Sequence, residues 1–266
     1  MQNSEPMVDI HCHLAPDLDD GAQSWRESLA MARMAVADGI HKVVVTPHQL
    51  GVFSRNGAEQ IRRRIGELRR WLAENQVSLE VHPGAEVHAE ASLADKIRDG
   101  EALTLADRGR HVLLDGTPDS LELLPTVLDA LASAGLTGVL AHPERLPALL
   151  RQPQRLKALV QRGCLLQVTA DSLVGANGDQ PRQLAEWLLR EGLVHVVATG
   201  AHGATSRRPL MRHAFIHISE ATNADVARAV CCQNPGSIVD GADVVVVQPR
   251  RNSRLFGPWL KWRRAG

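Results

Sequence analysis

The stretch "HCH" at residues 11–13 and the acidic turn that follows it indicate metal chemistry. Alternate residues of a β-strand point to the same face, so His11 and His13 would aim their imidazoles at one point. Imidazoles combined with carboxylates suit manganese, iron or zinc. A solvated turn before the next helix accounts fully for Asp17 and Asp19, and less well for Asp20.

Side chains of the same kinds stand at the ends of five further apolar runs. They are His48, Glu86, Asp115, His142 and His202. Taken alone, a histidine at a strand end is more often a hydrogen-bonded structural residue than a ligand. Because functional groups at the carboxyl ends of parallel barrel strands share one face, the joint set favours a single metal site.

Seven apolar runs without polar alternation predict buried β-strands, at residues 8–13, 42–48, 79–87, 111–116, 138–144, 164–170 and 194–202. Helical patterns separate them; the first opens with a capping box at Ser24 and Glu27, and others cover residues 58–75, 120–134, 154–162 and 181–191. Strands that alternate with helices predict an α/β fold of parallel βα units. A distorted seven-stranded (β/α) TIM-like barrel is the preferred architecture, and a doubly wound open sheet is the alternative.

The bulk composition narrows the class of protein. The 266 residues carry no formal net charge, so no overall field favours nucleic acid as a partner. None of the four cysteines precedes an arginine by six residues, which excludes a Cys-x5-Arg phosphatase, and no CxxC pair occurs. Neither a signal peptide nor an apolar run of about 18 residues is present, so a cytoplasmic location is expected.

Several motifs resemble a known family: "MVDIHCHLAPDLDDG", "TPH", "GAE", "AHPER", "GC…QVT" and "NPGSIVDG". They are similar to the bacterial PHP-family (polymerase and histidinol phosphatase-like) tyrosine phosphatases that act with capsule and exopolysaccharide tyrosine kinases. The likeness runs from about Met7 to Asp240. It implies a distorted (β/α)7 barrel, the PHP fold, with two to three metal ions, Mn²⁺ or alternatively Fe or Zn.

The resemblance also implies how the ligands are divided among three ions. Two histidines and a glutamate would hold the first ion. The same glutamate would bridge the first ion to the second ion, and the third ion would have a ligand set of its own. The three sets are His11, His13 and Glu86; Glu86, Asp115 and His142; and Asp20, His48 and His202.

Basic residues and two departures from the family pattern complete the comparison. Arg145 and Arg207 or Arg208 match positions that hold the phosphate. The family usually has glutamate where Asp115 stands, and Asp-x-His where this chain has Gly200 two residues before the last histidine. An enzyme with a water in place of the missing ligand is one interpretation. The other interpretations are a degenerate protein that binds a phosphoprotein or regulates a kinase, and a phosphoesterase that acts on small phosphoesters.

The expected reaction is hydrolysis of phosphotyrosine by metal-activated water, declining below a pH of ~6.5 as the ligand histidines become protonated. The expected partner is a phosphotyrosine protein, in particular a membrane-anchored bacterial tyrosine kinase.

Residues 1–6 would form an N-terminal extension and residues 7–248 the barrel. Residues 249–266 form a basic tail with Trp259 and Trp262, which suits a peripheral membrane contact or an acidic partner, or is simply solvated.

Overall fold

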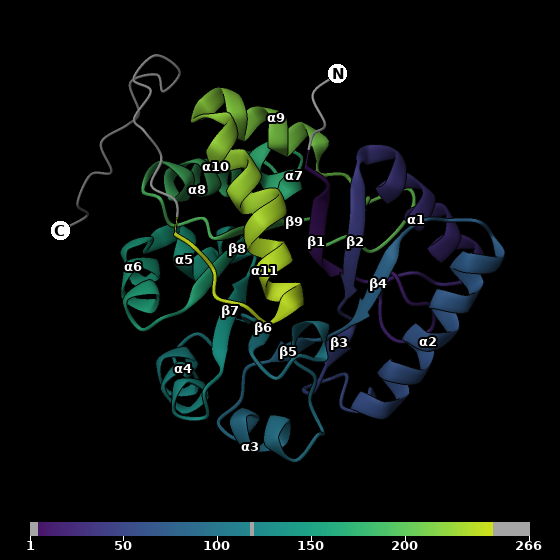
Figure 1. Ribbon diagram of the computed structural model, residues 1–266. Helices are drawn as coiled ribbons and strands as arrows, with labels where there is room; N and C mark the ends of the chain where they lie inside the picture. The colour runs from purple at the N-terminus through teal and green to yellow at the C-terminus, as the bar shows by residue number, and fades with distance from the viewer. Residues whose placement is uncertain (1–4, 118–119, 247–266) are drawn as a thin grey trace.

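The paired strands of the described part of the chain run parallel and are arranged in two sheets. The computed structural model describes residues 5–117 and 120–246 (Figure 1). One sheet has the order β1-β2-β4 and the other the order β3-β5-β6-β7-β8-β9. This order follows the chain, without the reversal that marks a doubly wound sheet. The observed fold is therefore an α/β fold of parallel strands.

The strands are short. Their bounds are β1 Met7–Cys12, β2 Ile40–Val45, β3 His48–Gln49, β4 Glu80–Pro83, β5 Glu86–His88, β6 His111–Asp115, β7 Thr137–Ala141, β8 Leu165–Thr169 and β9 Val196–Ala198.

Helices lie outside the strands. In chain order they are α1 Trp25–Asp38, α2 Ala58–Glu74, α3 Leu93–Arg98, η1 Leu105–Asp107, α4 Leu124–Ser133, η2 Pro143–Arg145, α5 Pro147–Arg151, α6 Gln154–Gln161, α7 Ala170–Leu173, α8 Asp179–Arg190, α9 Arg212–Ala221, α10 Ala224–Arg228, η3 Ala229–Gln233 and α11 Asn234–Asp240. Across residues 5–117 and 120–246, none of them has the length and apolar character needed to cross a membrane.

The second and third predicted strands are each broken into two. Pro47 separates β2 from β3, and its carbonyl accepts a hydrogen bond from the Glu86 backbone N–H at 3.1 Å. Gly84 separates β4 from β5; a Cβ on it would lie 2.6 Å from Val44 Cγ1, so a side chain does not fit there. The breaks let the ends of both runs turn, and they place His48 and Glu86 side by side in register.

Two hydrophobic clusters hold the strands and helices together. The large one contains the buried faces of the helices, such as Ile61 and Leu68 of α2. The small one contains strand residues including Val44 and Leu113, together with Ile238 of α11. Figure 1 shows α11 lying across the strands, which explains this contact.

Helices α9, α10 and α11 were not predicted from the sequence. The proposed tail, residues 249–266, lies outside the described residues.

Asp9 connects β1 to the segment after β9. Its buried carboxylate accepts hydrogen bonds from the backbone N–H groups of His11, at 3.1 Å, and Thr199, at 3.0 Å, and from the Thr199 hydroxyl. Nearby, Gly200 N donates to His11 O at 2.8 Å. These bonds hold the first strand, β1, against the segment that follows the last strand, β9, next to the "HCH" stretch.

Replacing Asp9 by alanine leaves three buried donors without their acceptor. We expect Asp9→Ala to lower the free energy of unfolding by about 3 kcal/mol, because each unpaired buried donor costs ~1–3 kcal/mol. Urea denaturation measures the loss. The exposed Asp129, paired with Arg162 at the surface, provides the control: Asp129→Ala is expected to change stability by less than about 0.5 kcal/mol. Equal effects of the two substitutions would contradict this role for Asp9.

Candidate metal centre

Four histidine side chains gather around the carboxylate of Glu86. Glu86 Oε2 lies 3.2 Å from His11 Nε2, 3.3 Å from His13 Nε2 and 3.2 Å from His48 Nδ1. Glu86 Oε1 lies 2.9 Å from His142 Nε2. The Glu86 side chain is 1% exposed, so these groups meet in a volume from which water is largely excluded.

This arrangement fits a cation. Burial disfavours the Glu86 anion, but His11 and the other imidazoles outweigh that effect and hold the pKa of Glu86 well below its usual range. Although three ring nitrogens lie close to it, Glu86 Oε2 makes no hydrogen bond with acceptable geometry. The nitrogens of His11 and His13 also face each other at 3.2 Å. Imidazole nitrogens and a carboxylate oxygen that converge in this way suit Mn, Fe or Zn.

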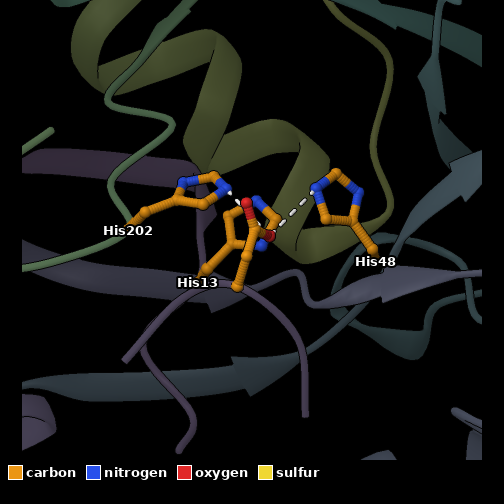
Figure 2. A group of neighbouring side chains, drawn as sticks. His13, His48 and His202 are labelled. Atoms are coloured by element: carbon orange, nitrogen blue, oxygen red, sulfur yellow. Dashed lines mark ion pairs between the residues drawn. The ribbon is translucent and has the colours of Figure 1, made fainter. Parts of the chain in front are cut away.

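A second group of ligand-type side chains lies beside the first. It consists of His13, Asp20, His48 and His202, whose ligand atoms lie within 4.8 Å of one another. Figure 2 shows the three imidazoles turned toward a common centre. Asp20 Oδ1 is 3.6 Å from both His48 Nε2 and His202 Nε2, and its side chain is 59% exposed. This side of the centre therefore opens toward solvent.

Three of the imidazoles are held through Nδ1, which leaves Nε2 directed at the centre. The holding atoms are Gln167 Oε1, 2.8 Å from His11; Asp19 Oδ2, 2.6 Å from His13; and Gly200 O, 3.0 Å from His202. A partner that accepts from one ring nitrogen fixes the tautomer and frees the other nitrogen for a metal.

The interpretation of Asp19 as part of a solvated turn is wrong. Its side chain is 1% exposed, and it also accepts hydrogen bonds from His48 N at 2.8 Å and Gly21 N at 2.9 Å. Gly21 is required because a Cβ there would lie 2.4 Å from His13 Cβ. The turn wraps around His13 and carries Asp19 inward. Asp17, in contrast, is exposed as expected.

Opposite pKa shifts of two histidines follow from these surroundings. Burial opposes protonation of His13, but Asp19 and Glu86 outweigh it and raise the pKa of His13 to about 9. Burial, reinforced by the charge on His13, lowers the pKa of His202 to about 2. His202 is therefore neutral at physiological pH, whereas His13 must lose a proton before it can bind a metal.

The grouping of the ligand candidates differs in part from the expected one. His11, His13 and Glu86 converge as the resemblance implied, and His142 meets Glu86. His13, however, also falls into the group of Asp20, His48 and His202, and neither compact group includes Asp115. Asp115 ends β6 nearby, where burial and the charge of Glu86 raise its pKa.

Three arginines add positive charge beside the centre. Arg145 ends η2, three residues after His142, and Arg207 and Arg208 lie in the loop after His202. Burial and the neighbouring Arg145 lower the pKa of Arg207. One half-buried acid, Asp171, interacts with all three guanidinium groups. Guanidinium groups pair well with phosphate oxygens, so the three arginines suit an anionic ligand such as a phosphate.

Gln167 and Phe53 contact the candidate ligands and were not singled out from the sequence. Gln167 is a buried polar residue inside the apolar run "CLLQVTA". A polar residue within an apolar strand is the sequence feature that could have identified it as functional. The ring of Phe53 stacks on His48 with centroids 5.0 Å apart. Phe53 lies in a loop between a strand and a helix, where no periodicity marks it.

The fold and the centre together define the class: an α/β protein of parallel strands with a candidate metal centre of imidazoles and carboxylates at their carboxyl ends. The chain belongs to the capsular polysaccharide synthesis family CpsB/CapC, whose family model matches residues 7–240. This membership confirms the resemblance drawn from the motifs.

Named relatives cover nearly the whole chain. Tyrosine-protein phosphatase YwqE from Bacillus subtilis (strain 168) is 32% identical over 94% of this chain and 99% of its own length. Tyrosine-protein phosphatase CpsB from Streptococcus pneumoniae is 29% identical over 88% of this chain and 98% of its own length. A crystal structure from work on these two, described as unique metal-dependent tyrosine phosphatases, matches with a TM-score of 0.84 at 28% identity, covering 93% of this chain and 100% of that one.

We expect Asp19→Asn to weaken Mn²⁺ binding by about 10- to 100-fold, because loss of a group that orients a ligand histidine typically has this effect. Equilibrium binding under chelator competition measures the change. Asp17→Asn is the matched control in the same turn, since Asp17 is exposed and pairs with Arg64 at 3.2 Å. An Asp19→Asn protein that folds and binds Mn²⁺ as tightly as the Asp17→Asn protein would show that Asp19 has no role in the centre.

The raised pKa of His13 predicts how pH affects metal binding. Below about pH 9 the metal-free His13 carries a proton that the ion must displace, so Mn²⁺ affinity should rise up to ~10-fold per pH unit between pH 6.5 and 8.5. The proton on His13 also stabilises the metal-free fold. That contribution is complete below pH ~6.5 and is lost as pH rises through about 9. Affinity that stays flat over this interval would contradict the assignment.

Proposed function

We propose that the protein is a metal-dependent protein-tyrosine phosphatase. The observation that carries the proposal is the convergence of histidines and Glu86 beside three arginines. Membership of the CpsB/CapC family, with relatives named tyrosine-protein phosphatases over nearly the whole chain, supports it. The substrate would be a phosphotyrosine protein, either a bacterial tyrosine kinase or an exopolysaccharide-biosynthesis protein.

The metal would be Mn²⁺, or alternatively Fe or Zn, with two to three ions per chain. The residues that would hold it are His11, His13, Asp20, His48, Glu86, Asp115, His142 and His202. When bound, such ions supply an activated water at neutral pH and neutralise charge on a phosphate. The protein's own part is to keep each Nε2 directed inward through the partners of Nδ1 and to keep His202 neutral.

The arginines would hold the phosphate. Burial and the neighbouring Arg145 lower the pKa of Arg207, and an anion bound beside Arg207 would offset both effects. Arg208 is exposed and lies next in the chain, so it suits contact with a protein substrate. The leaving tyrosinate has a conjugate acid of pKa ~10, so its departure requires little help from a general acid.

Closure of the strands into a barrel is also part of the proposal. The bonds from Asp9 to Thr199 and from Gly200 N to His11 O, together with an isolated parallel bridge between Cys12 and Ala201, support a (β/α)7 barrel closed between β1 and β9. A cytoplasmic location is supported by four buried cysteines that form no disulfide.

Gly200 favours one competing function. A chain without a side-chain ligand at this position could bind phosphotyrosine through its arginines and not hydrolyse it. The buried and well-anchored histidines weigh against that alternative, because a protein that only binds phosphate has no need of them. Measurement of turnover separates the two functions.

The deciding experiment is hydrolysis of a phosphotyrosine peptide by the purified protein with Mn²⁺ and with EDTA. We expect turnover with Mn²⁺, none with EDTA, and much slower release from phosphoserine peptides and small phosphoesters. Arg145→Ala should reduce kcat/KM by about 100-fold. Arg151→Ala, on the exposed end of α5, is the control and should leave the rate unchanged. Equal rates with and without EDTA would exclude metal-dependent chemistry, and metal binding without turnover would favour the binding function.

A further inference from the structure

The backbone at Gly200 leaves room for a group beside His11. Gly200 is buried, and its φ of 57° lies in the left-handed region. A Cβ built on it would lie 3.9 Å from Thr169 Cγ2 and 4.0 Å from His11 Cε1, which are ordinary van der Waals contacts. A small group can therefore stand next to the His11 ring at this position without displacing its neighbours.

Two buried polar atoms without hydrogen-bond partners accompany this position. Gln167 Nε2 and Thr169 Oγ1 belong to residues that are 0% and 3% exposed, and neither atom has a partner among the described residues. Gln167 and Thr169 are two positions apart on β8, so their side chains share a face. The other end of the Gln167 amide, Oε1, already contacts His11 Nδ1 at 2.8 Å. An unpaired buried donor is costly, so its presence points to a ligand.

We propose that a small carboxylate anion, of the size of formate or acetate, binds beside Gly200. It would accept hydrogen bonds from Gln167 Nε2 and Thr169 Oγ1 and act as the carboxylate ligand that Gly200 does not provide. This inference rests on the proposed metal-dependent function. It makes Gln167 and Thr169 the binding residues of a site whose occupant comes from solution.

The chemistry of the donors favours a carboxylate over a water molecule. Acetate has the same four heavy atoms as an aspartate side chain beyond Cα, and the position of the first of these atoms, Cβ, is free at Gly200. A carboxylate accepts at about four lone-pair positions and donates nothing, whereas a water has two lone pairs. Two protein donors and a cation together exceed what one water can accept. The Thr169 backbone N–H donates to Glu144 Oε1 at 3.1 Å, whereas the Thr169 hydroxyl has no partner among the described residues.

The test is Mn²⁺ affinity measured with the full-length protein in chloride, formate and acetate at equal ionic strength and equal free Mn²⁺. We expect formate or acetate to tighten binding by about 10-fold, the size of effect seen for groups around a metal site. Bulky trimethylacetate should have no effect, because only a small anion fits. With Co²⁺ in place of Mn²⁺, the absorption spectrum should change when acetate is added, which reports coordination independently of catalysis.

Variants at position 200 provide the matched comparison. Gly200→Asp carries its own carboxylate, so it should bind Mn²⁺ more tightly than the unmodified protein and not respond to acetate. Gly200→Asn has the same shape and a similar tolerance for the left-handed backbone but no charge, so it should show no such gain. Thr169→Val keeps the shape of the side chain and removes the hydroxyl, and it should reduce the acetate response about fivefold.

The possible failures are distinguishable. Mn²⁺ that binds with an affinity independent of formate and acetate would overturn the carboxylate site and leave the phosphatase proposal standing. Absence of bound metal in the unmodified protein and in Gly200→Asp would overturn both. A carboxylate effect of equal size in Gly200→Asp would also overturn the inference, because it would place the anion elsewhere.

Discussion

The candidate metal centre depends on one constraint: its buried imidazole nitrogens include more hydrogen-bond acceptors than there are N–H donors to satisfy them. Four imidazoles surround the Glu86 carboxylate, and Nε2 of His11 and Nε2 of His13 face each other at 3.2 Å. A neutral imidazole donates at one nitrogen only. Nδ1 of His11 and of His13 already has a partner, so while both rings are neutral their facing Nε2 atoms are acceptors that cannot satisfy one another. A cation at this place would satisfy both nitrogens. In the metal-free protein, burial disfavours a proton on His13, but Asp19 and Glu86 outweigh burial and raise the pKa of His13 to about 9, so this ring can donate.

The surrounding structure serves this arrangement by orienting rings rather than by adding ligands. Asp19 reaches His13 because the turn at Gly21 passes close to the ring. Gln167 reaches His11 Nδ1 from β8. Asp9 ties the backbone of His11 to Thr199, and so fixes the distance between the first and last strands. Each of these residues is buried, so each has only a few positions it can take.

Sequence patterns predicted the parts of the structure that depend on local periodicity. The runs of β-branched residues marked all seven strand regions, and Ser24 caps α1 through the Glu27 N–H as its motif implied. Breaks within two of these regions escaped prediction, because Pro47 and Gly84 act through contacts with other strands. Asp19 and Asp20 are adjacent and chemically alike. Only the path of the turn, set by packing against His13, decides that Asp19 is buried and Asp20 exposed.

Gly200 illustrates how backbone and side chain can have separate roles at one position. Its carbonyl accepts from His202 Nδ1, and its N–H donates to His11 O. The backbone at Gly200 is left-handed, with a φ of 57°, a conformation that glycine adopts at least cost and that asparagine and aspartate tolerate better than most residues. Loss of a side-chain carboxylate there therefore leaves the orientation of His202 intact. The hydrogen bonds that hold His11 and His202 at this position come from the backbone and do not depend on a side chain at position 200.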